Sequence, residues 1–248
     1  MRTILITGAT SGIGEATARL LIKTNRLILC GRRNERLEKL QSELSLINEV
    51  TTLNFDVSNR KAVFESIESL PDNFKSIDVL INNAGNAHGL ATFQDAELDD
   101  LDAMIDINVK GLIYVTKAVL PFMSKNSNKH IINLSSIAGK QVYTNGTTYC
   151  ASKFAVEALT RGMRLDFLPL GIKVTSIAPG AVETEFSLVR FKGDSERAET
   201  VYKGYEALQA ENIAETIEFV INQPEYVQLA DITILPKNQA DAINFLKE

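Results

Sequence analysis

Short apolar runs alternate along the chain with longer amphipathic stretches, and this alternation constrains the fold more than any other feature. The runs are rich in Ile, Leu and Val and lack polar alternation, which is typical of strands buried on both faces of a sheet. Because repeated strand–helix–strand order implies right-handed crossovers, we predict an α/β fold: a Rossmann-like, doubly wound parallel sheet of about seven strands with helices on both faces. The predicted strands are 3–7, 26–30, 50–55, 79–81, 130–134, 173–178 and 232–235. The predicted helices are 14–23, 34–46, 61–69, 98–125, 149–167 and 213–222.

The length of the chain allows one domain of this kind. Its 248 residues, 45% of them hydrophobic, can bury a sizeable core, and we predict a single dinucleotide-binding and catalytic domain over 1–248. The stretch 187–210 departs from the rhythm, because it is charged and carries Gly193 and Gly204 between a strand and a helix. We predict that this insertion forms a lid over the substrate.

Charge and cysteine content exclude several classes of partner. The net charge of −5 argues against nucleic acid, and no apolar run approaches the roughly 18 residues that would span a membrane. Cys30 and Cys150 are far apart and no apolar leader opens the chain, so we expect a reduced, cytoplasmic setting. His88 and His130 lack metal-ligand spacing, so we expect no metal site.

A glycine-rich turn follows the first predicted strand. The sequence of residues 8–14 is Gly-Ala-Thr-Ser-Gly-Ile-Gly, and a helix follows directly. In such a turn Gly8 permits the bend, Gly12 lets the backbone approach a phosphate, and Gly14 lets helix and strand pack closely. The helix N-terminus then points its N–H groups at a pyrophosphate. The residues predicted here to bind a dinucleotide are Gly8, Thr10, Ser11, Gly12, Ile13 and Gly14.

An arginine pair at the end of the second strand selects the nicotinamide cofactor. NAD sites usually carry an acidic residue there for the ribose hydroxyls, but this chain has Arg32 and Arg33. Two guanidinium groups suit the 2′-phosphate of NADP, so we predict NADP as the cofactor. The alternative is that the two arginines only begin a solvated helix with Glu35 and Glu38.

Small and polar residues follow the other strands, and the carboxyl ends of parallel strands meet at one edge of a sheet. After the third strand, the Asp56 carboxylate can accept a hydrogen bond from an adenine amino group. Asp56 can also cap the next helix, and the two roles are compatible. The remaining strand-end residues are Val57, Asn83, Ala84, Gly85, Ser136, Pro179 and Gly180.

Tyr149 and Lys153 are four residues apart at the start of a predicted helix and therefore share a face. A neighbouring ammonium lowers the pKa of a phenol, so Tyr149 can give or take a substrate proton as general acid or base. Ser136 can hydrogen-bond the substrate oxygen as charge develops on it. In an arbitrary sequence a Tyr-x-x-x-Lys pair is commonly a surface pair, but thirteen residues after a strand-end serine it favours catalysis.

Together these motifs resemble the short-chain dehydrogenase/reductase family, in family order from Thr7 to about Gly180. The resemblance implies that Asn108 is a fourth catalytic residue, which holds a water linking Lys153 to solvent. It also implies that Asn83 supports the cofactor and that the backbone after Pro179 holds the nicotinamide carboxamide. The implied cofactor-binding residues further include Tyr149, Lys153, Val182 and Thr184.

A narrower resemblance rests on residues 31–37 and 185–194, which are similar to the NADP-dependent 3-hydroxy acid dehydrogenase branch. Members of that branch act on serine, allo-threonine, 3-hydroxyisobutyrate or malonic semialdehyde. They are usually homotetramers, and the resemblance places helices 98–125 and 149–167 at an interface.

Several charged residues near the expected cleft have two interpretations each. Arg190 and Lys192, in the predicted lid, can meet a substrate carboxylate or simply be solvated. His88 follows the Asn-Asn-Ala-Gly motif and has a possible substrate-side role. His130 opens an apolar strand, where a structural role is the commoner one.

The sequence therefore favours an NADP-dependent oxidoreductase that exchanges a hydride with a small 3-hydroxy or 3-oxo acid. One alternative is a carbonyl reductase for a bulkier substrate, such as a 3-oxoacyl thioester, a sugar or a ketone. Another is a non-catalytic NADP-sensing protein, against which the intact set Asn108, Ser136, Tyr149 and Lys153 argues.

Overall fold

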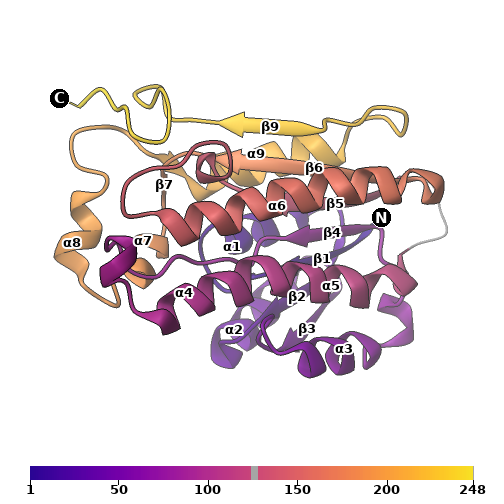
Figure 1. Cartoon of the computed structure of the whole chain (residues 1–248). Helices are drawn as coiled ribbons and strands as arrows, with labels where there is room; N and C mark the ends of the chain where they lie inside the picture. Colours follow the sequence, from indigo (N-terminus) through magenta and orange to yellow (C-terminus); the bar gives the residue numbers. More distant parts are fainter. Residues whose placement is uncertain (124–127, 248) are drawn as a thin grey trace.

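A seven-stranded parallel sheet runs through the part of the chain that the structure, a computed structural model, describes: residues 1–123 and 128–247 (Figure 1). The strand order is β3-β2-β1-β4-β5-β6-β9, so the order reverses between β1 and β4. Ligands of such sheets bind beyond the carboxyl ends of the strands at this reversal. The strands are β1 (Thr3–Thr7), β2 (Arg26–Gly31), β3 (Val50–Asn54), β4 (Val79–Asn82), β5 (Lys129–Leu134), β6 (Ile172–Pro179) and β9 (Asp231–Ile234).

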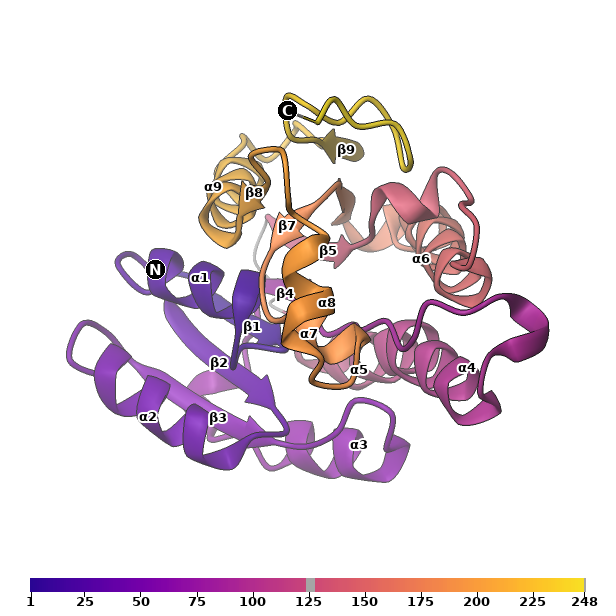
Figure 2. The same cartoon turned by 90° about the vertical axis from the view of Figure 1, so that its left-hand side faces the viewer.

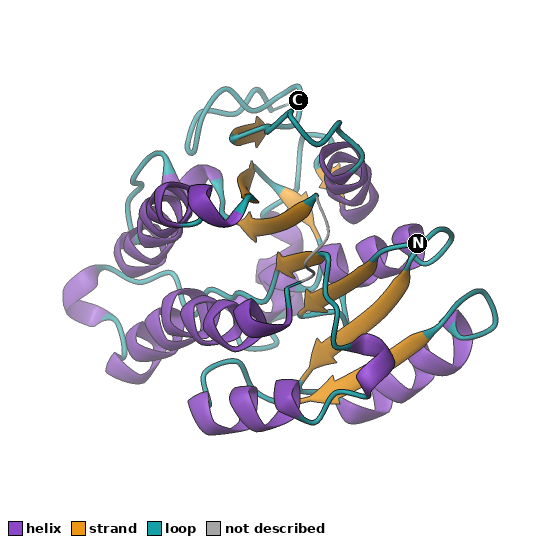
Figure 3. Cartoon of the chain, turned by 90° about the vertical axis from the view of Figure 1, so that its right-hand side faces the viewer, coloured by secondary structure: helices purple, strands orange, loops and turns teal. Residues whose placement is uncertain are grey.

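Helices cover both faces of the sheet (Figures 1 and 3). Neighbouring residues of β1 point to opposite faces, so Ile4 and Ile6 pack in one core cluster and Leu5 in the other. The first cluster lies under α1 (Gly12–Leu21), α2 (Asn34–Leu44) and α9 (Ala210–Ile221). On the other face are α3 (Arg60–Glu68), α4 (Leu98–Ile105), α5 (Leu112–Val119) and α6 (Thr147–Asp166). The predicted doubly wound α/β fold is confirmed, with the predicted strands matched to within two residues at each end.

The predicted helix 98–125 is interrupted, and its last two residues lie outside the described residues. After α4 the backbone widens into a π-helical turn over Asp106–Gly111 before α5 begins. A Cβ at Gly111 would lie 2.8 Å from Val57 Cγ2, so the chain needs glycine where it passes the end of β3. Pro121 then cannot continue the α-helix, and the segment closes with a 3-10 turn over Leu120–Phe122. Periodicity cannot detect these breaks because the apolar pattern runs through them.

The predicted lid region, 187–210, contains two short helices. They are α7 (Phe186–Arg190) and α8 (Ser195–Thr200), and both stand over the carboxyl ends of the strands (Figure 2). A small parallel pair of strands, β7 (Val182–Glu183) and β8 (Leu208–Gln209), closes the base of the segment. No pattern in the sequence predicts this pair, because two-residue strands carry no periodicity.

Three further properties hold for the described residues. No helix among them is long and apolar enough to cross a membrane. No group of three or more metal-ligating side chains occurs among them. Cys30 and Cys150 are both buried thiols.

Candidate active site

A cavity of about 610 Å³ opens at the carboxyl edge of the sheet, between the strand ends and the segment that carries α7 and α8. Of the residues predicted to form a site, Gly14 and Asn108 do not line this cavity. The cavity does bring together Gly8, Thr10, Ser11, Gly12, Ile13, Arg32, Arg33, Asp56, Val57, Asn83, Ala84, Gly85, Ser136, Tyr149, Lys153, Pro179, Gly180, Val182, Thr184 and Arg190. Residues from six strand ends and from the lid region therefore meet around one space.

The glycine turn forms one wall of the cavity. Gly8 and Gly12 have φ angles of 66° and 52°, a left-handed conformation that glycine adopts readily. A Cβ at Gly14 would lie 2.3 Å from the Gly8 carbonyl oxygen, so Gly14 supports the turn from behind. The Asn83 amide holds the same turn by donating to the Thr7 and Gly8 carbonyl oxygens at 2.9 and 3.2 Å. The glycine turn is thus held in this conformation by contacts within the protein.

The N-terminus of α1 adjoins this turn. Ser11 is the N-cap residue, and its side chain makes no capping hydrogen bond. The first-turn N–H groups of a helix lack intrahelical partners and, with the helix dipole, favour an anion. The residues present therefore fit a dinucleotide pyrophosphate.

Arg33 is the N-cap residue of the exposed helix α2, and its side chain turns back over the glycine turn. Its Nη2 donates to Ser11 Oγ at 2.6 Å, and its Nε donates to Thr10 Oγ1 at 3.2 Å. Its Nη1 lies 2.9 Å from Oε2 of Glu185, the N-cap residue of α7, so Arg33 does not pair with Glu35 or Glu38 of its own helix.

Arg32 and Asp56 form a second charged pair in the cavity, with Nη1 and Oδ2 3.0 Å apart. Burial raises the pKa of Asp56, but hydrogen bonds from Ser58 and Arg32 outweigh it, so the net pKa is lowered and the carboxylate is charged. The capping role considered for Asp56 falls to Asn59, whose side chain accepts from the Ala62 N–H at the start of α3.

Tyr149 and Lys153 lie in the first two turns of α6, and both are buried. Lys153 Nζ donates to the Leu134 carbonyl oxygen at 2.9 Å and lies 6.0 Å from the Tyr149 ring centroid. Burial lowers the pKa of Lys153 to about 8, and the charge of Glu157 opposes this shift. Since ordinary lysines titrate near 10.4, this ammonium is poised much closer to neutral pH.

The pKa of Tyr149 is raised, not lowered. Burial is the main cause, the neighbouring Tyr143 adds to it, and the Ser136 hydroxyl and Arg190 charge oppose it. The expectation that Lys153 lowers this pKa is wrong for the protein alone, because desolvation of the phenolate dominates. Tyr149 is therefore a protonated phenol that can donate a hydrogen bond or a proton.

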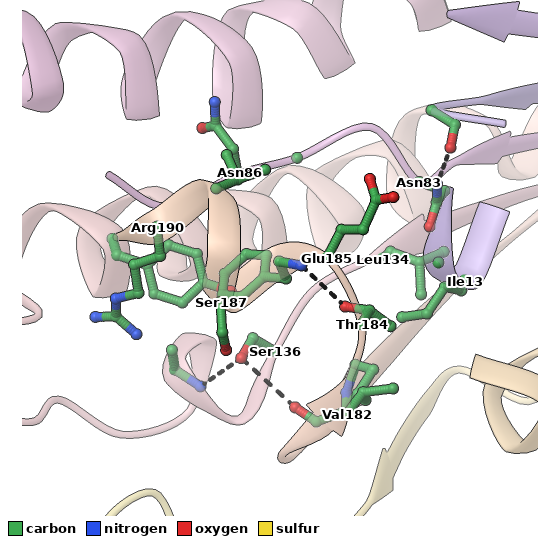
Figure 4. Close-up of a pocket in the computed structure, with 18 of the residues that line it drawn as sticks. Ile13, Asn83, Asn86, Leu134, Ser136, Val182, Thr184, Glu185, Ser187 and Arg190 are labelled. Atoms are coloured by element: carbon green, nitrogen blue, oxygen red, sulfur yellow. Dashed lines mark hydrogen bonds between the residues drawn. The ribbon is translucent and has the colours of Figure 1, made fainter. Parts of the chain in front are cut away.

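Ser136 begins a 3-10 turn over Ile137–Gly139 directly after β5. Its Oγ accepts from the Ala138 N–H at 3.1 Å and lies 3.5 Å from the Pro179 carbonyl oxygen. Figure 4 draws Ser136, Val182, Thr184 and Arg190 around the same cavity. The hydroxyl is thus held at a strand end beside the tyrosine.

Asn108 lies behind the cavity in the π-helical turn, a feature frequent at functional sites. Its Nδ2 donates to the Asn86 carbonyl oxygen at 2.8 Å and to Ser152 Oγ at 3.0 Å, so it joins the β4 loop to α6. A Cβ at Gly85 would lie 3.2 Å from Asn108 Oδ1 and 3.3 Å from Lys153 Nζ. Gly85 therefore leaves a narrow space between these two polar groups.

Arg190 is the charged side chain of the lid that faces the tyrosines. Its guanidinium carbon lies 5.7 Å from the ring centroids of both Tyr143 and Tyr149. Nη2 donates to the Tyr143 hydroxyl at 3.1 Å, and Nε donates to the Gly89 carbonyl oxygen at 3.1 Å. Lys192 points elsewhere and pairs with Asp100 at 2.8 Å, outside the cavity.

The two histidines also lie outside this cavity. His88 lines a smaller neighbouring pocket, and its Nε2 is 2.7 Å from Asn86 Nδ2. His130 is buried in β5 with its Nε2 2.8 Å from Thr175 Oγ1.

Several residues that line the cavity were not predicted from the sequence: Tyr143, Glu185, Phe186, Tyr202, Tyr205, Phe245 and Lys247. Most lie in loops or short helices, where no periodicity marks the buried side. Only Tyr143 could have been found from the sequence, because it lies between the predicted site residues Ser136 and Tyr149.

Comparison with known proteins agrees with this geometry. A sequence model described as short chain dehydrogenase matches residues 2–194, and the chain belongs to this family. It is 43% identical over 245 residues to an "NADP-dependent 3-hydroxy acid dehydrogenase" of Schizosaccharomyces pombe, covering 97% of this chain and 95% of that protein. It is also 43% identical over 239 residues to "Sulfoacetaldehyde reductase 2" of Chromohalobacter salexigens, covering 96% and 95%.

Among solved structures, the chain resembles the closed form of a serine dehydrogenase complexed with NADP+. The TM-score is 0.92 with 40% sequence identity, and the match covers 99% of this chain and 100% of the other.

Proposed function

We propose that the protein is an NADP-dependent oxidoreductase that transfers a hydride between nicotinamide and a small 3-hydroxy or 3-oxo acid, with Tyr149 as general acid and base. The observation that carries this proposal is one cavity with an arginine pair at the glycine turn and Ser136, Tyr149, Lys153 and Arg190 around its other end. The names of the similar proteins support both the cofactor and the substrate class.

The cofactor would lie along the strand ends. The glycine turn and the N-terminus of α1 would hold the pyrophosphate, and Arg32 with Arg33 would hold the 2′-phosphate. Asp56 and Val57 would border the adenine. Residues Asn83, Ala84, Gly85, Pro179, Gly180, Val182 and Thr184 would position the nicotinamide end. When bound, NADPH supplies the hydride.

In the direction of reduction, Tyr149 donates its phenolic proton to the substrate carbonyl oxygen. Its raised pKa keeps that proton in place until the oxygen gains charge. Ser136 donates a hydrogen bond to the same oxygen, and the Lys153 ammonium stabilises the phenolate that remains. In the direction of oxidation the same groups act in reverse.

Asn108 completes the proposed catalytic set without touching the substrate. Its side chain spans the β4 loop and α6, and its Oδ1 borders the space beside Lys153 Nζ. A water in that space would pass a proton between Lys153 and solvent, which returns Tyr149 to its protonated state.

Arg190 and Ser136 are the proposed substrate-binding residues. Arg190 Nη1 has no hydrogen-bond partner among the described residues, and a guanidinium suits a substrate carboxylate. The acidic cavity residues Asp56 and Glu185 are each paired with arginine. The cavity therefore suits a substrate with one negative charge and no ammonium group.

We also propose that residues 187–210 form a lid on a single domain over 1–248. Glu185, at the base of this segment, pairs with Arg33 and with Arg36 at 2.9 and 2.8 Å. These ion pairs fasten the base of the segment to Arg33 of the cavity wall and to Arg36 of α2, which supports a segment held over the cavity.

A cytoplasmic homotetramer is the proposed form of the protein. Exposed apolar side chains on the α4 and α6 helices support it, namely Leu98, Phe154 and Leu165. The buried thiols of Cys30 and Cys150 are consistent with a reducing compartment. Light scattering coupled to size exclusion tests the assembly, and a monomer would contradict it.

The function is tested by following NADPH absorbance while purified protein meets NADP and a panel of hydroxy acids. The panel is serine, allo-threonine, 3-hydroxyisobutyrate, 3-hydroxypropionate and 2-hydroxyethanesulfonate, repeated with NAD. We expect reduction of NADP, much slower reduction of NAD, and a preference for 3-hydroxypropionate over zwitterionic serine. No turnover of any acid, with turnover of a thioester or ketone by NADPH, would overturn the substrate class. NADPH binding without turnover of anything would indicate a sensor.

A further inference from the structure

A buried carboxylate lies beside the candidate catalytic residues but outside the cavity. Glu157 is four residues after Lys153 in α6, so the two side chains share a face of the helix. Only 4% of Glu157 is exposed, and it does not line the cavity. It therefore cannot contact the substrate, and the mechanism above does not use it.

The Glu157 carboxylate joins elements that carry different parts of the site. Its Oε1 accepts from Ser176 Oγ of β6 at 2.7 Å. Its Oε2 lies 3.1 Å from Lys140 Nζ, an ion pair without a hydrogen bond, and Lys140 is the residue that ends the turn begun by Ser136. Lys140 in turn lies 2.6 Å from Asp231 at the start of β9. A chain of charges thus runs from α6 through the Ser136 turn to the edge of the sheet.

The same turn is packed directly on α6. A Cβ at Gly139 would lie 2.8 Å from the Lys153 carbonyl oxygen and 3.1 Å from Glu157 Cγ. It would also lie 2.7 Å from Ser135 Oγ. No side chain separates the turn from the helix. Loss of the Lys140–Glu157 ion pair should therefore shift the backbone of the turn that begins at Ser136.

Packing alone does not explain an ion pair at this place. Burying a carboxylate costs free energy, and an apolar residue of similar volume commonly serves stability as well or better. The charge has a second consequence, because Glu157 opposes the effect of burial on Lys153. Both effects act on residues of the proposed catalytic set.

We propose that Glu157 is a positioning residue: its ion pair with Lys140 holds the Ser136 turn against α6, and its carboxylate places a negative charge beside Lys153. This inference rests on the proposed function for its kinetic consequence. Glu157 acts on the reaction through Ser136 and Lys153 and touches neither substrate nor cofactor.

The test compares Glu157→Gln with Lys140→Met and with the double variant. Glu157→Gln keeps the shape and can still accept from Ser176, but removes the charge. We expect kcat to fall about tenfold, with KM and the Kd for NADPH within about twofold of the wild type. Lys140→Met should lower kcat similarly, and the double variant should be no worse than the poorer single one, since the two side chains act as one unit. Glu43→Gln, which removes an exposed ion pair with Arg19, is the control and should leave kcat unchanged.

The pH dependence separates this role from a merely structural one. The charged or titratable groups around Lys153 are Tyr149 and Glu157, with Lys140 and Asp231 behind Glu157. Without the carboxylate, Lys153 loses its proton at lower pH, so the alkaline limb of kcat should move down by about one pH unit. The Lys153 signal of protein labelled with ¹³Cε-lysine, assigned with Lys153→Met, should titrate lower by a similar amount.

Two results would overturn the proposal. The first is a folded Glu157→Gln whose kcat lies within twofold of the wild-type value and whose alkaline limb does not move. The other is a loss of kcat that only follows lost NADPH binding or a lower unfolding temperature, with the lysine titration unchanged. If the wild type turned over no substrate, the proposed function would fail, while the lysine titration would still decide whether Glu157 acts on Lys153. If Glu157→Gln does not fold, Lys140→Met still tests the hold on the Ser136 turn, and kcat within twofold of the wild type would overturn it. The alkaline limb should not move down in Lys140→Met, because the Glu157 charge remains beside Lys153.

Discussion

The replacement Arg190→Met removes the charge that we propose binds the substrate carboxylate. Methionine keeps part of the length of the side chain as an apolar group, but it removes the guanidinium, whose carbon lies 5.7 Å from the centroids of the Tyr143 and Tyr149 rings. A hydrogen bond to a charged group contributes about 1.5–3 kcal/mol. Losing about 2 kcal/mol of binding corresponds to a roughly 30-fold weaker complex, because each 1.4 kcal/mol is a factor of ten. We expect KM for 3-hydroxypropionate to rise about 30-fold, with kcat changed less than about threefold.

The assay is the initial rate of NADP reduction at varied substrate concentration. Lys192→Met is the matched control, because it removes one positive charge two residues away, from a side chain that pairs with Asp100 outside the cavity. Its KM should equal that of the wild type. The methyl ester of the substrate is the second control, since it lacks the charge and should lose little on Arg190→Met.

An unchanged KM for the acid in Arg190→Met would refute the reasoning. An equal rise in KM for acid and ester would refute it too, because it would show that Arg190 shapes the cavity and does not bind a carboxylate. Thermal unfolding of each variant checks that lost hydrogen bonds to Gly89 and Tyr143 have not changed the fold.

Three other predictions follow from the charged groups. Replacing Arg32 and Arg33 together by alanine should raise the Kd for NADPH about 100-fold and the Kd for NADH less than about threefold, because only NADPH carries the 2′-phosphate. Fluorescence titration measures both Kd values, and an equal loss of affinity for the two cofactors would contradict the prediction. Glu185→Gln breaks the exposed ion pairs with Arg33 and Arg36, which contribute at most about 1 kcal/mol each. We therefore expect NADPH to dissociate about two- to fivefold faster in a stopped-flow experiment. An unchanged dissociation rate would argue against a lid held by Glu185. Burial lowers the pKa of His130 to about 3. Because the unfolded chain then takes up a proton below about pH 6.5 that the folded chain does not, this group should lower the free energy of unfolding by about 1.4 kcal/mol per pH unit as the pH falls towards 3. Urea unfolding of His130→Gln at pH 7 and pH 5 should show a smaller loss than the wild type, and an equal loss would contradict the assignment.

The sheet was predictable because its strands are buried on both faces. Continuous apolar runs such as 3–7 mark such strands, and the crossover rule orders them. The break at Asp106–Gly111 was not predictable, because it depends on the approach of Gly111 to Val57, which are 54 positions apart. Short strands such as Val182–Glu183 are stabilised by their partner rather than by any local pattern.

The site was predictable where it depends on strand ends and not where it depends on contacts across the cavity. Tyr149, Lys153 and Ser136 follow from spacing, since a helix and a strand end place them. The pairing of Arg33 with Glu185 joins residues 152 positions apart, and no local feature announces it. The pKa of Tyr149 was predicted with the wrong sign because the sequence shows the nearby lysine but not the extent of burial.

The most direct test of the account is the transfer of deuterium from NADPH deuterated at C4 of the nicotinamide to malonic semialdehyde, followed by mass spectrometry of the product. The account predicts that the wild type forms 3-hydroxypropionate carrying the label at C3 from one of the two C4 epimers. It also predicts that Tyr149→Phe binds NADPH as tightly but forms almost no labelled product. Unlabelled product, or NADPH binding with no product in the wild type, would contradict the claim that this chain transfers a hydride to a small 3-oxo acid.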